Sequence, residues 1–370
     1  MPFRTQASRV TMLLLLSFVA LVACATPAAT PTTAPVQPPV ATSAPAAIAV
    51  PATTAPTAAP TTAPVVKLHV AYSAIAVPQL PMWVAFEQGL FKKYGLEVTL
   101  DYVATSQVLA ASMLANEVQI AQLAEDGIIT SGLEGADLTI LAPSTDHLLF
   151  SLYVRPGSGI EKVQDLKGKK VGMTQRNSAT DFAARWLISH NGMKPDQDVT
   201  LLGMGGVPQI LTGLQSGAID AGVLSPPTTF QADQQGMKEL VDYATLDLPF
   251  YQSAVVARKS WIKGNPNVVR RFMQAYVEGI AALKKDKAMA KQVLGKYSKT
   301  TDDTVLEQTY GVFVKILPNA PIPTSQAIQV GLDEVAATNA KAKTADPNQF
   351  FDPSWVTELD KSGFISALYK

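Results

Sequence analysis

Residues 208–224, Pro-Gln-Ile-Leu-Thr-Gly-Leu-Gln-Ser-Gly-Ala-Ile-Asp-Ala-Gly-Val-Leu, contain a predicted helix followed directly by a predicted strand. Pro208 suits the first turn of a helix, because that turn leaves its N–H groups free, and Gly217 suits the helix end, because glycine accepts a left-handed conformation. The apolar segment 219–224 has the length of a buried strand. This helix-to-strand unit predicts an α/β fold.

The same alternation extends along the chain from residue 65 and predicts mainly parallel sheets. Strands are expected at 68–72, 96–102, 118–123, 138–142, 170–174, 199–203 and 254–257. Helices are expected at 81–94, 106–116, 178–192 and 208–217, after 126 and after 227, and from 265 onward. The expected N-terminal caps are Ser106, Asp126, Ser178 (in a capping box with Asp181) and Asn265.

The globular part is expected to form two lobes, because about 300 residues exceed what one hydrophobic core usually serves. A turn-rich stretch at 155–159 marks a boundary. Strand-like segments at 149–154 and 251–257 bracket the second lobe, so the chain is expected to cross between lobes twice and to form a two-strand hinge. The predicted lobes are 65–154 with 253–370, and 155–252.

The N-terminal segment predicts export and a lipid anchor. Arg4 and Arg9 precede a short apolar run that ends in Leu21-Val22-Ala23-Cys24, and this run suits a signal peptide better than a membrane span. The last four residues resemble the lipobox of bacterial lipoproteins. Residues 1–23 are therefore expected to be removed and Cys24 to be lipidated, which would hold the protein on the extracytoplasmic face of the membrane. The alternative is an ordinary cleaved signal.

Residues 24–64 are predicted to be a tether. After Cys24 this segment consists almost entirely of Ala, Thr, Pro and Val, and it carries no charge. Such a composition cannot bury a core, and its prolines favour extended segments. The globular body would thus stand away from the lipid surface.

Composition argues against several functions. The chain has 30 basic and 30 acidic residues, so no single-sign field points to nucleic acid. Cys24 is the only cysteine, which leaves no disulfide, cysteine zinc site or thiol nucleophile in the folded part. No zinc-protease, serine-hydrolase or phosphate-loop motif occurs, and Gly203-Met204-Gly205-Gly206 lacks the third glycine of a dinucleotide fingerprint. We therefore expect no catalytic residues, metal or cofactor, and the scattered His69, His147 and His190 are interpreted as structural or exposed.

Three runs together resemble substrate-binding proteins of the nitrate/sulfonate/taurine and THI5-like (NMT1) group: residues 86–98 (FEQGLFKKYGLEV), 165–172 (DLKGKKVG) and 214–221 (LQSGAIDA). The resemblance implies a type II periplasmic-binding-protein fold whose lobes close on a small organic solute. It also implies a monomer that delivers the solute to the permease of an ABC importer and its ATPase subunit.

By position, the resemblance places four loops at the cleft. Their candidate ligand-binding residues are Tyr72, Ser73, Gln79 and Trp83 in the first loop, Glu125 and Asp126 in the second, Thr174, Asn177, Ser178 and Thr180 in the third, and Ser225, Pro226 and Thr228 in the fourth.

Each of these interpretations has an alternative. Tyr72 and Trp83 could stack on a flat ligand or lie in the core. Asn177, Ser178 and Thr180 could contact the ligand or only cap their helix. Two carboxylates at Glu125 and Asp126 would repel an anion and so favour a neutral or cationic solute, unless Asp126 only caps a helix and Glu125 points to solvent. Arg176 could pair with an anionic ligand or be solvated.

Two other functions fit the same resemblance. THI5-like pyrimidine-biosynthesis enzymes share the fold, but they resemble one another in a cysteine-rich motif that this chain lacks, and the chain carries an export signal. A ligand-sensing surface module without a transport role would have the same fold and the same anchor.

Overall fold

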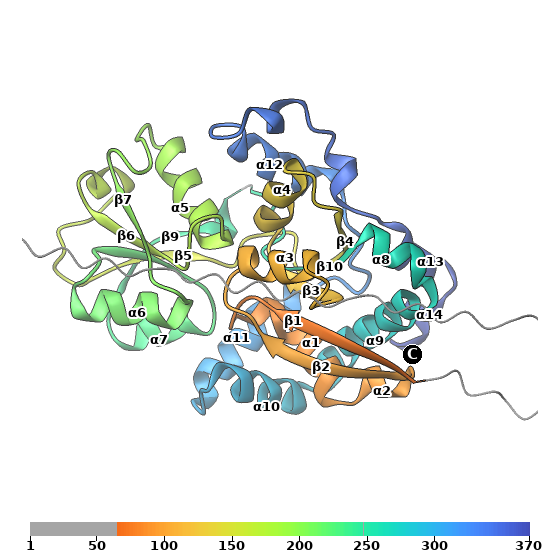
Figure 1. Ribbon diagram of the computed structural model, residues 1–370. Coiled ribbons are helices and arrows are strands. Elements are labelled where there is room, and N and C mark those ends of the chain that lie inside the picture. The colour runs from red at the N-terminus through yellow and green to blue at the C-terminus, as the bar shows by residue number, and fades with distance from the viewer. Residues whose placement is uncertain (1–64, 247) are drawn as a thin grey trace, which may run out of the picture. The chain divides into compact units, whose positions relative to one another are not determined.

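The computed structural model describes residues 65–246 and 248–370 (Figure 1). The predicted signal peptide, Cys24 and the tether lie outside these residues. Ten strands form two five-stranded sheets. The first sheet has the order β2-β1-β3-β10-β4 and consists of β1 (Val66–Tyr72), β2 (Leu96–Tyr102), β3 (Ile120–Leu123), β4 (Leu138–Pro143) and β10 (Ala254–Arg258). The second has the order β7-β6-β8-β5-β9 and consists of β5 (Ser151–Val154), β6 (Lys170–Met173), β7 (Thr200–Gly203), β8 (Ala221–Leu224) and β9 (Lys238–Asp242).

Each sheet contains one antiparallel strand. β10 lies antiparallel between β3 and β4, and β5 lies antiparallel between β8 and β9. The pairs β1–β2, β1–β3, β6–β7 and β6–β8 are parallel. The mainly parallel α/β architecture is confirmed, and both antiparallel strands are those that enter a sheet from the other one.

The helices group around the two sheets. Those of the first lobe, which we define as the first sheet and its helices, are α1 (Leu80–Glu87), α2 (Leu90–Lys93), α3 (Ser106–Leu114), α4 (Glu125–Leu133), α8 (Lys259–Gly264), α9 (Pro266–Lys285), α10 (Lys287–Ser298), α11 (Asp303–Ile316), α12 (Ser325–Val335), α13 (Ser354–Lys361) and α14 (Phe364–Ala367). The second lobe has α5 (Ala179–His190) on one side of its sheet and α6 (Val207–Ser216) and α7 (Thr228–Gln234) on the other (Figure 1). Within the described ranges, no helix combines the length and apolar character needed to cross a membrane.

Alternation along β1 gives the first sheet two buried faces. Leu68 and Val70 point into a core shared with α1 and α9, whereas Ala71 belongs to a core formed with α3, α4 and α12. β10 repeats the pattern, with Val255 in the first core and Val256 in the second. Because side chains on a strand point alternately to opposite faces, a central strand with helices on both sides is apolar at most of its buried positions.

The crossings between the sheets run side by side. Residues 144–150 lead from β4 to β5, and the return segment leads from β9 to β10. Ser144 donates its N–H to the Ser253 carbonyl at 2.8 Å, and Phe250 donates to the Asp146 carbonyl at 3.0 Å. His147 and Pro249 form an antiparallel bridge between them. The lobes are thus joined by a paired, two-stranded connection.

Several predicted boundaries are wrong in detail. The second lobe begins earlier than residue 155, because β5 pairs with β8 and β9. The expected helix 81–94 is two helices, because Gly89 adopts a left-handed conformation with φ 66° and interrupts it. Strand β9 was not predicted; its burial is only partial, and its sequence lacks a clear apolar alternation.

Three predicted helix caps also need correction. Thr105, not Ser106, caps α3 by accepting a hydrogen bond from the Val108 N–H. Asp126 lies inside the first turn of α4 and is not its cap. Asn265 is the N-cap residue of α9, as predicted, but its side chain donates to the Trp261 carbonyl and makes no capping hydrogen bond to α9. Ser178 does cap α5, as predicted, but Asp181 accepts from the Asn177 N–H, one residue before the position of a standard capping box.

We predict that Gly279→Ala destabilises the first lobe. Gly279 is where α9 lies closest to α1: a methyl group there would lie 2.8 Å from the Pro81 carbonyl oxygen and 2.9 Å from the Ala85 Cβ. Overpacking of this kind costs about 1–3 kcal/mol, more than the roughly 1 kcal/mol that alanine gains over glycine in a helix. Urea denaturation would measure the loss. The control is Gly311→Ala on α11, where no atom lies within 4 Å and stability should rise; equal effects at the two positions would contradict the prediction.

Candidate functional site

A cavity of about 130 Å³ lies between the two lobes. Its first wall comes from loops of the first lobe, its second from loops of the second lobe, and its floor from the crossing segments. These walls consist of Ser73–Ala76, Pro78, Gln79, Tyr102, Thr105, Ser106 and Ala124, then Thr174, Ser178–Thr180, Gly205–Gln209 and Ser225, with Phe150, Gln252 and Ser253 as the floor.

Parallel strands explain why these loops meet. The lining loops follow β1, β2 and β3 in the first lobe and β6, β7 and β8 in the second. Ligands of open α/β sheets bind beyond the carboxyl ends of the strands. The helices that follow these strands begin at the cavity, so the N-termini of α3, α5 and α6 also border it, with N–H groups that have no partner within the helix.

The first-lobe wall is fixed by side-chain hydrogen bonds. The Ser106 hydroxyl accepts from the Ala124 N–H at 3.2 Å, which ties the loop after β3 to the start of α3. Gln79 donates its Nε2 to the Ser253 hydroxyl at 2.9 Å, so this wall is also tied to the floor. The Gln79 Oε1 atom is buried and has no hydrogen-bond partner in the described part of the chain. The Gln79 Oε1 atom is therefore a fixed hydrogen-bond acceptor that no donor among the described residues occupies.

The second-lobe wall carries a cluster of three hydroxyl groups. Thr174 Oγ1 lies 2.8 Å from both Ser178 Oγ and Thr180 Oγ1, and the latter two are 3.0 Å apart. Asn177 has a left-handed backbone with φ 56°, which turns the chain from the strand into α5. The hydroxyls thus both order the first turn of α5 and border the cavity. Ser225, on the neighbouring loop, has a buried hydroxyl for which the described residues offer no partner.

The lobes contact each other beside the cavity. The Val77 N–H of the first lobe donates to the Pro226 carbonyl of the second at 3.3 Å. Gln234 on α7 donates to Asp302, the cap of α11, at 2.9 Å. These contacts hold the two lobes against each other beside the cavity.

The cavity lining is uncharged. Of the described residues that form it, none is Asp, Glu, Lys, Arg or His. Tyr102 is the single tyrosine among them; it is 43% exposed, and partial burial raises the pKa of its phenol. A solute in this cavity would meet hydroxyl, amide and backbone groups, the rings of Tyr102 and Phe150, and no formal charge.

The predicted site residues separate into two groups. Six of them line the cavity: Ser73, Gln79, Thr174, Ser178, Thr180 and Ser225. Pro226 and Thr228 lie close to Ser225 in the sequence but do not line the cavity, and Asn177 lines a neighbouring cavity. Tyr72 and Trp83 are buried in the first-lobe core, where Trp83 stacks on Tyr297 with ring centroids 4.6 Å apart. This placement corresponds to the core alternative and leaves both rings outside the cavity.

Glu125 and Asp126 do not line this cavity. Glu125 is fully buried, and its Oε2 accepts from the Tyr251 N–H at 2.9 Å, which ties α4 to the return crossing. Burial raises the pKa of Glu125 well above its usual value. Asp126 lies at a separate cavity between the lobes. The sequence predicted that these two carboxylates would face the solute and repel anions. They do not face this cavity, so any preference for an uncharged solute must be argued from the uncharged lining.

Several parts of the lining were not predicted from the sequence: Tyr102, Thr105, Ser106, Ala124, Phe150, Gly205–Gln209, Gln252 and Ser253. The start of α6 had a usable signal, because Gly205-Gly206 precedes Pro208 directly after a predicted strand. Tyr102 is the last residue of an expected strand, and the carboxyl end of a strand is where a ligand contact is expected. Phe150 and Gln252 have no local signal, because their position depends on the pairing of two distant segments.

The three histidines do not form a site. His69 contacts Asp101, His147 contacts Asp146 and His190 contacts the Trp186 carbonyl. Among the residues that the structure describes, no group of three or more His, Cys, Asp or Glu side chains is arranged to hold a metal.

Comparison with known proteins assigns the family. Residues 78–290 match the family model described as NMT1/THI5 like, which covers more than half of the chain. The chain belongs to the NMT1/THI5-like family. A Brachyspira hyodysenteriae protein named as an ABC transporter periplasmic binding protein is 32% identical over 143 residues, or 38% of this chain and 40% of that protein.

A second relative and a solved structure extend the comparison. Riboflavin-binding protein RibY of Chloroflexus aurantiacus is 22% identical over 54% of this chain and 57% of its own length. The chain thus spans about half the length of the curated relatives that it matches. The nitrate-binding protein NrtA from Synechocystis has the same fold, with a TM-score of 0.68 at 16% identity, over 83% of this chain and 91% of that one. The NMT1/THI5-like chain has the type II periplasmic-binding-protein fold.

We predict that Ser178→Ala lowers the stability of the protein by about 1 kcal/mol, the usual cost of removing a helix cap. The Ser178 hydroxyl accepts from the Asp181 N–H at 3.3 Å and bonds to Thr174. Ser178→Thr, which keeps the hydroxyl, should lose much less. Urea denaturation would compare the two variants, and equal losses would contradict a capping role.

Proposed function

We propose that the chain is an extracytoplasmic solute-binding lipoprotein that traps a small organic solute between its lobes and delivers it to the permease of an ABC importer. The observation that carries this proposal is the enclosed cavity at the carboxyl ends of strands from both lobes. A solute that contacts both walls stabilises the closed form by the difference between its affinities for the closed and open forms. Relatives named as periplasmic and riboflavin-binding proteins support the role.

The lining favours an uncharged solute with a flat apolar part. A fully ionised solute would find no opposite side-chain charge in the lining. A cation would have no charged partner at all, and an anion would have only the backbone N–H groups at the starts of α3, α5 and α6. An uncharged ring could lie against Tyr102 or Phe150 and donate a hydrogen bond to the Gln79 Oε1 atom, which is buried without a partner. We propose no enzymatic activity, because the lining lacks the paired acid, base or nucleophile that catalysis uses.

A thermal-shift panel tests this proposal. Pyrimidines and flavins should raise the melting temperature of the full chain in proportion to the logarithm of their concentration, whereas aliphatic sulfonates and nitrate should not. Stabilisation by sulfonates or nitrate alone would contradict the uncharged solute class. A panel without any stabilising compound would count against solute binding.

We predict that Ser225→Ala weakens binding of a solute from that panel by roughly two- to tenfold, the value of one hydrogen bond, without lowering stability. Among the residues that the structure describes, the Ser225 hydroxyl has no hydrogen-bond partner to lose. The matched control is Thr229→Val on α7, which removes another buried hydroxyl without a partner, but one outside the cavity lining. Calorimetric titration would measure both variants. Equal solute affinity in Ser225→Ala and the unmodified chain would show that the Ser225 hydroxyl does not bind the solute.

We predict that Cys24→Ala releases the protein from the membrane fraction. The anchor is proposed to be carried by the thiol of Cys24 alone, so its removal should change location but not solute affinity. Fractionation of cells, followed by immunoblotting, would show the location. Retention of Cys24→Ala in the membrane fraction would refute the lipid anchor.

A further inference from the structure

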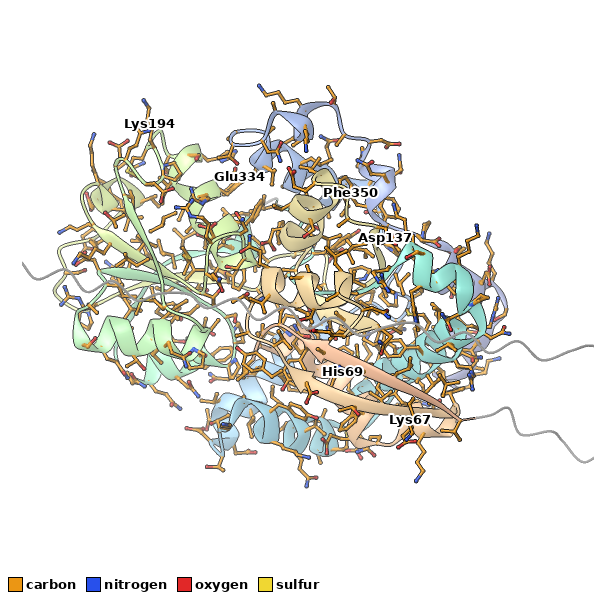
Figure 2. The ribbon with its side chains drawn as sticks, in the orientation of Figure 1. Lys67, His69, Asp137, Lys194, Glu334 and Phe350 are labelled. Carbon is orange, nitrogen blue, oxygen red and sulfur yellow. The ribbon has the colours of Figure 1, made fainter. Side chains whose placement is uncertain are left out.

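A second cavity, of about 400 Å³, lies between the lobes on the side of α4, α12 and α5. It shares Ser178 with the solute cavity but has a different character, because its lining is charged. The first lobe contributes Asp126 from α4 and Glu334 from α12. Figure 2 labels Glu334. The second lobe contributes Asp181 and Arg185 from α5, together with Arg176 and Asp196.

Asp126 is an unusual residue in this cavity. It is 5% exposed, and in the described part of the chain no side chain bonds to either of its carboxylate oxygens. The backbone N–H groups of Asp126 and Gly127 lower its pKa, but by less than burial raises it. A buried, ionised carboxylate without a charged partner is strongly destabilising, and the same carboxyl in its protonated form costs much less. Burial, reinforced by the charge of Asp181, raises the pKa of Asp126 well above its usual value.

The two arginines do not neutralise Asp126, because other carboxylates already hold them. Arg185 Nε lies 2.7 Å from Asp181, and Arg185 Nη1 lies 2.9 Å from Asp196. Arg176 lies 3.1 Å from Asp196. Asp181 also accepts from the Asn177 N–H at 2.8 Å. The second lobe therefore places opposite Asp126 a carboxyl, Asp181, that Arg185 and the Asn177 N–H hold in position. Burial raises the pKa of Asp181, and its contacts with Arg185 and the Asn177 N–H oppose that rise.

The other titratable groups near Asp126 that the structure describes do not form an ion pair with it. Glu334 forms no ion pair among the described residues, and burial raises the pKa of its carboxyl. Glu125, next to Asp126 on α4, is engaged with the Tyr251 N–H. His190, at the end of α5, stacks on Trp186 and bonds to its carbonyl.

We propose that Asp126 is a proton-binding site coupled to lobe closure, so that the closed protein holds one proton at Asp126 that the open protein releases. This inference rests on the proposed function in one respect: the lobes open and close. When they separate, α4 moves away from α5, water reaches Asp126, and Asp181 is no longer opposite. The carboxyl then ionises as an ordinary aspartate does.

The direction of the pH effect follows from the proton balance. Below the ordinary aspartate pKa of about 4, Asp126 is protonated in both forms, and closure is independent of this group. Above that pH the open form has lost its proton, so closure must take one up. The ratio of closed to open protein then falls by up to about tenfold per pH unit, until the pKa of the closed form is reached. Acid conditions favour closure, and alkaline conditions favour opening.

Single-molecule energy transfer between the lobes tests the proposal without any solute. Dyes would be attached to the full chain carrying Cys24→Ser, Lys194→Cys and Lys343→Cys, because both lysines are exposed and lie on different lobes. Between pH 5 and pH 8 the closed-to-open ratio should fall at least about tenfold with Asp126 present, and by less than about threefold in Asp126→Asn. Asp360→Asn, which changes an exposed carboxylate on α13, should behave like the parent.

Two results would overturn the proposal: a ratio that does not change with pH while Asp126 is present, or the same pH dependence in Asp126→Asn and the parent. If Asp126→Asn does not fold, Asp126→Ser, another neutral side chain, takes its place. Because no solute is added, failure here leaves the thermal-shift test of solute binding untouched, and failure of that test leaves this one untouched.

Discussion

The paired crossing of the chain between its two sheets is the constraint on which the rest of the structure depends. Hydrogen bonds between Ser144 and Ser253 and between Asp146 and Phe250 hold the outgoing and returning segments together. They make β5 and β10 enter their sheets antiparallel to the neighbouring strands. They also set the carboxyl ends of both sets of parallel strands opposite each other. The solute cavity is a consequence of this connection, since its floor is made of the same segments.

The two cavities between the lobes differ in chemical character, because one has an uncharged lining and the other a charged one. The inner one is lined by uncharged groups and helix N-termini, and it is suited to recognise a solute by shape and hydrogen bonding. The outer one brings charged groups of both lobes together, and these groups determine the electrostatic cost of closing. In the proposed account, solute specificity and pH response are carried by largely different residues, with Ser178 lining both cavities.

Local chemistry made most of the fold predictable, and long-range pairing explains the failures. Pro208 and Gly217 bounded α6 correctly, because each acts on its own backbone. Ser73 and Ser178 were predicted at the cleft and line the cavity, because they lie in loops that follow β1 and β6. Trp83 was misplaced as a ligand contact, because a helix pattern does not reveal which neighbour covers a side chain. Phe150 and Gln252 were missed, since only the pairing of segments about 100 residues apart brings them to the floor.

The central claim is that the closed cavity holds a small uncharged solute. The most direct measurement is to purify the full chain from its native host, unfold it, and identify any released molecule by mass spectrometry. The account predicts one uncharged organic compound in a stoichiometric amount. Stoichiometric release of an inorganic anion or a sulfonate would contradict it.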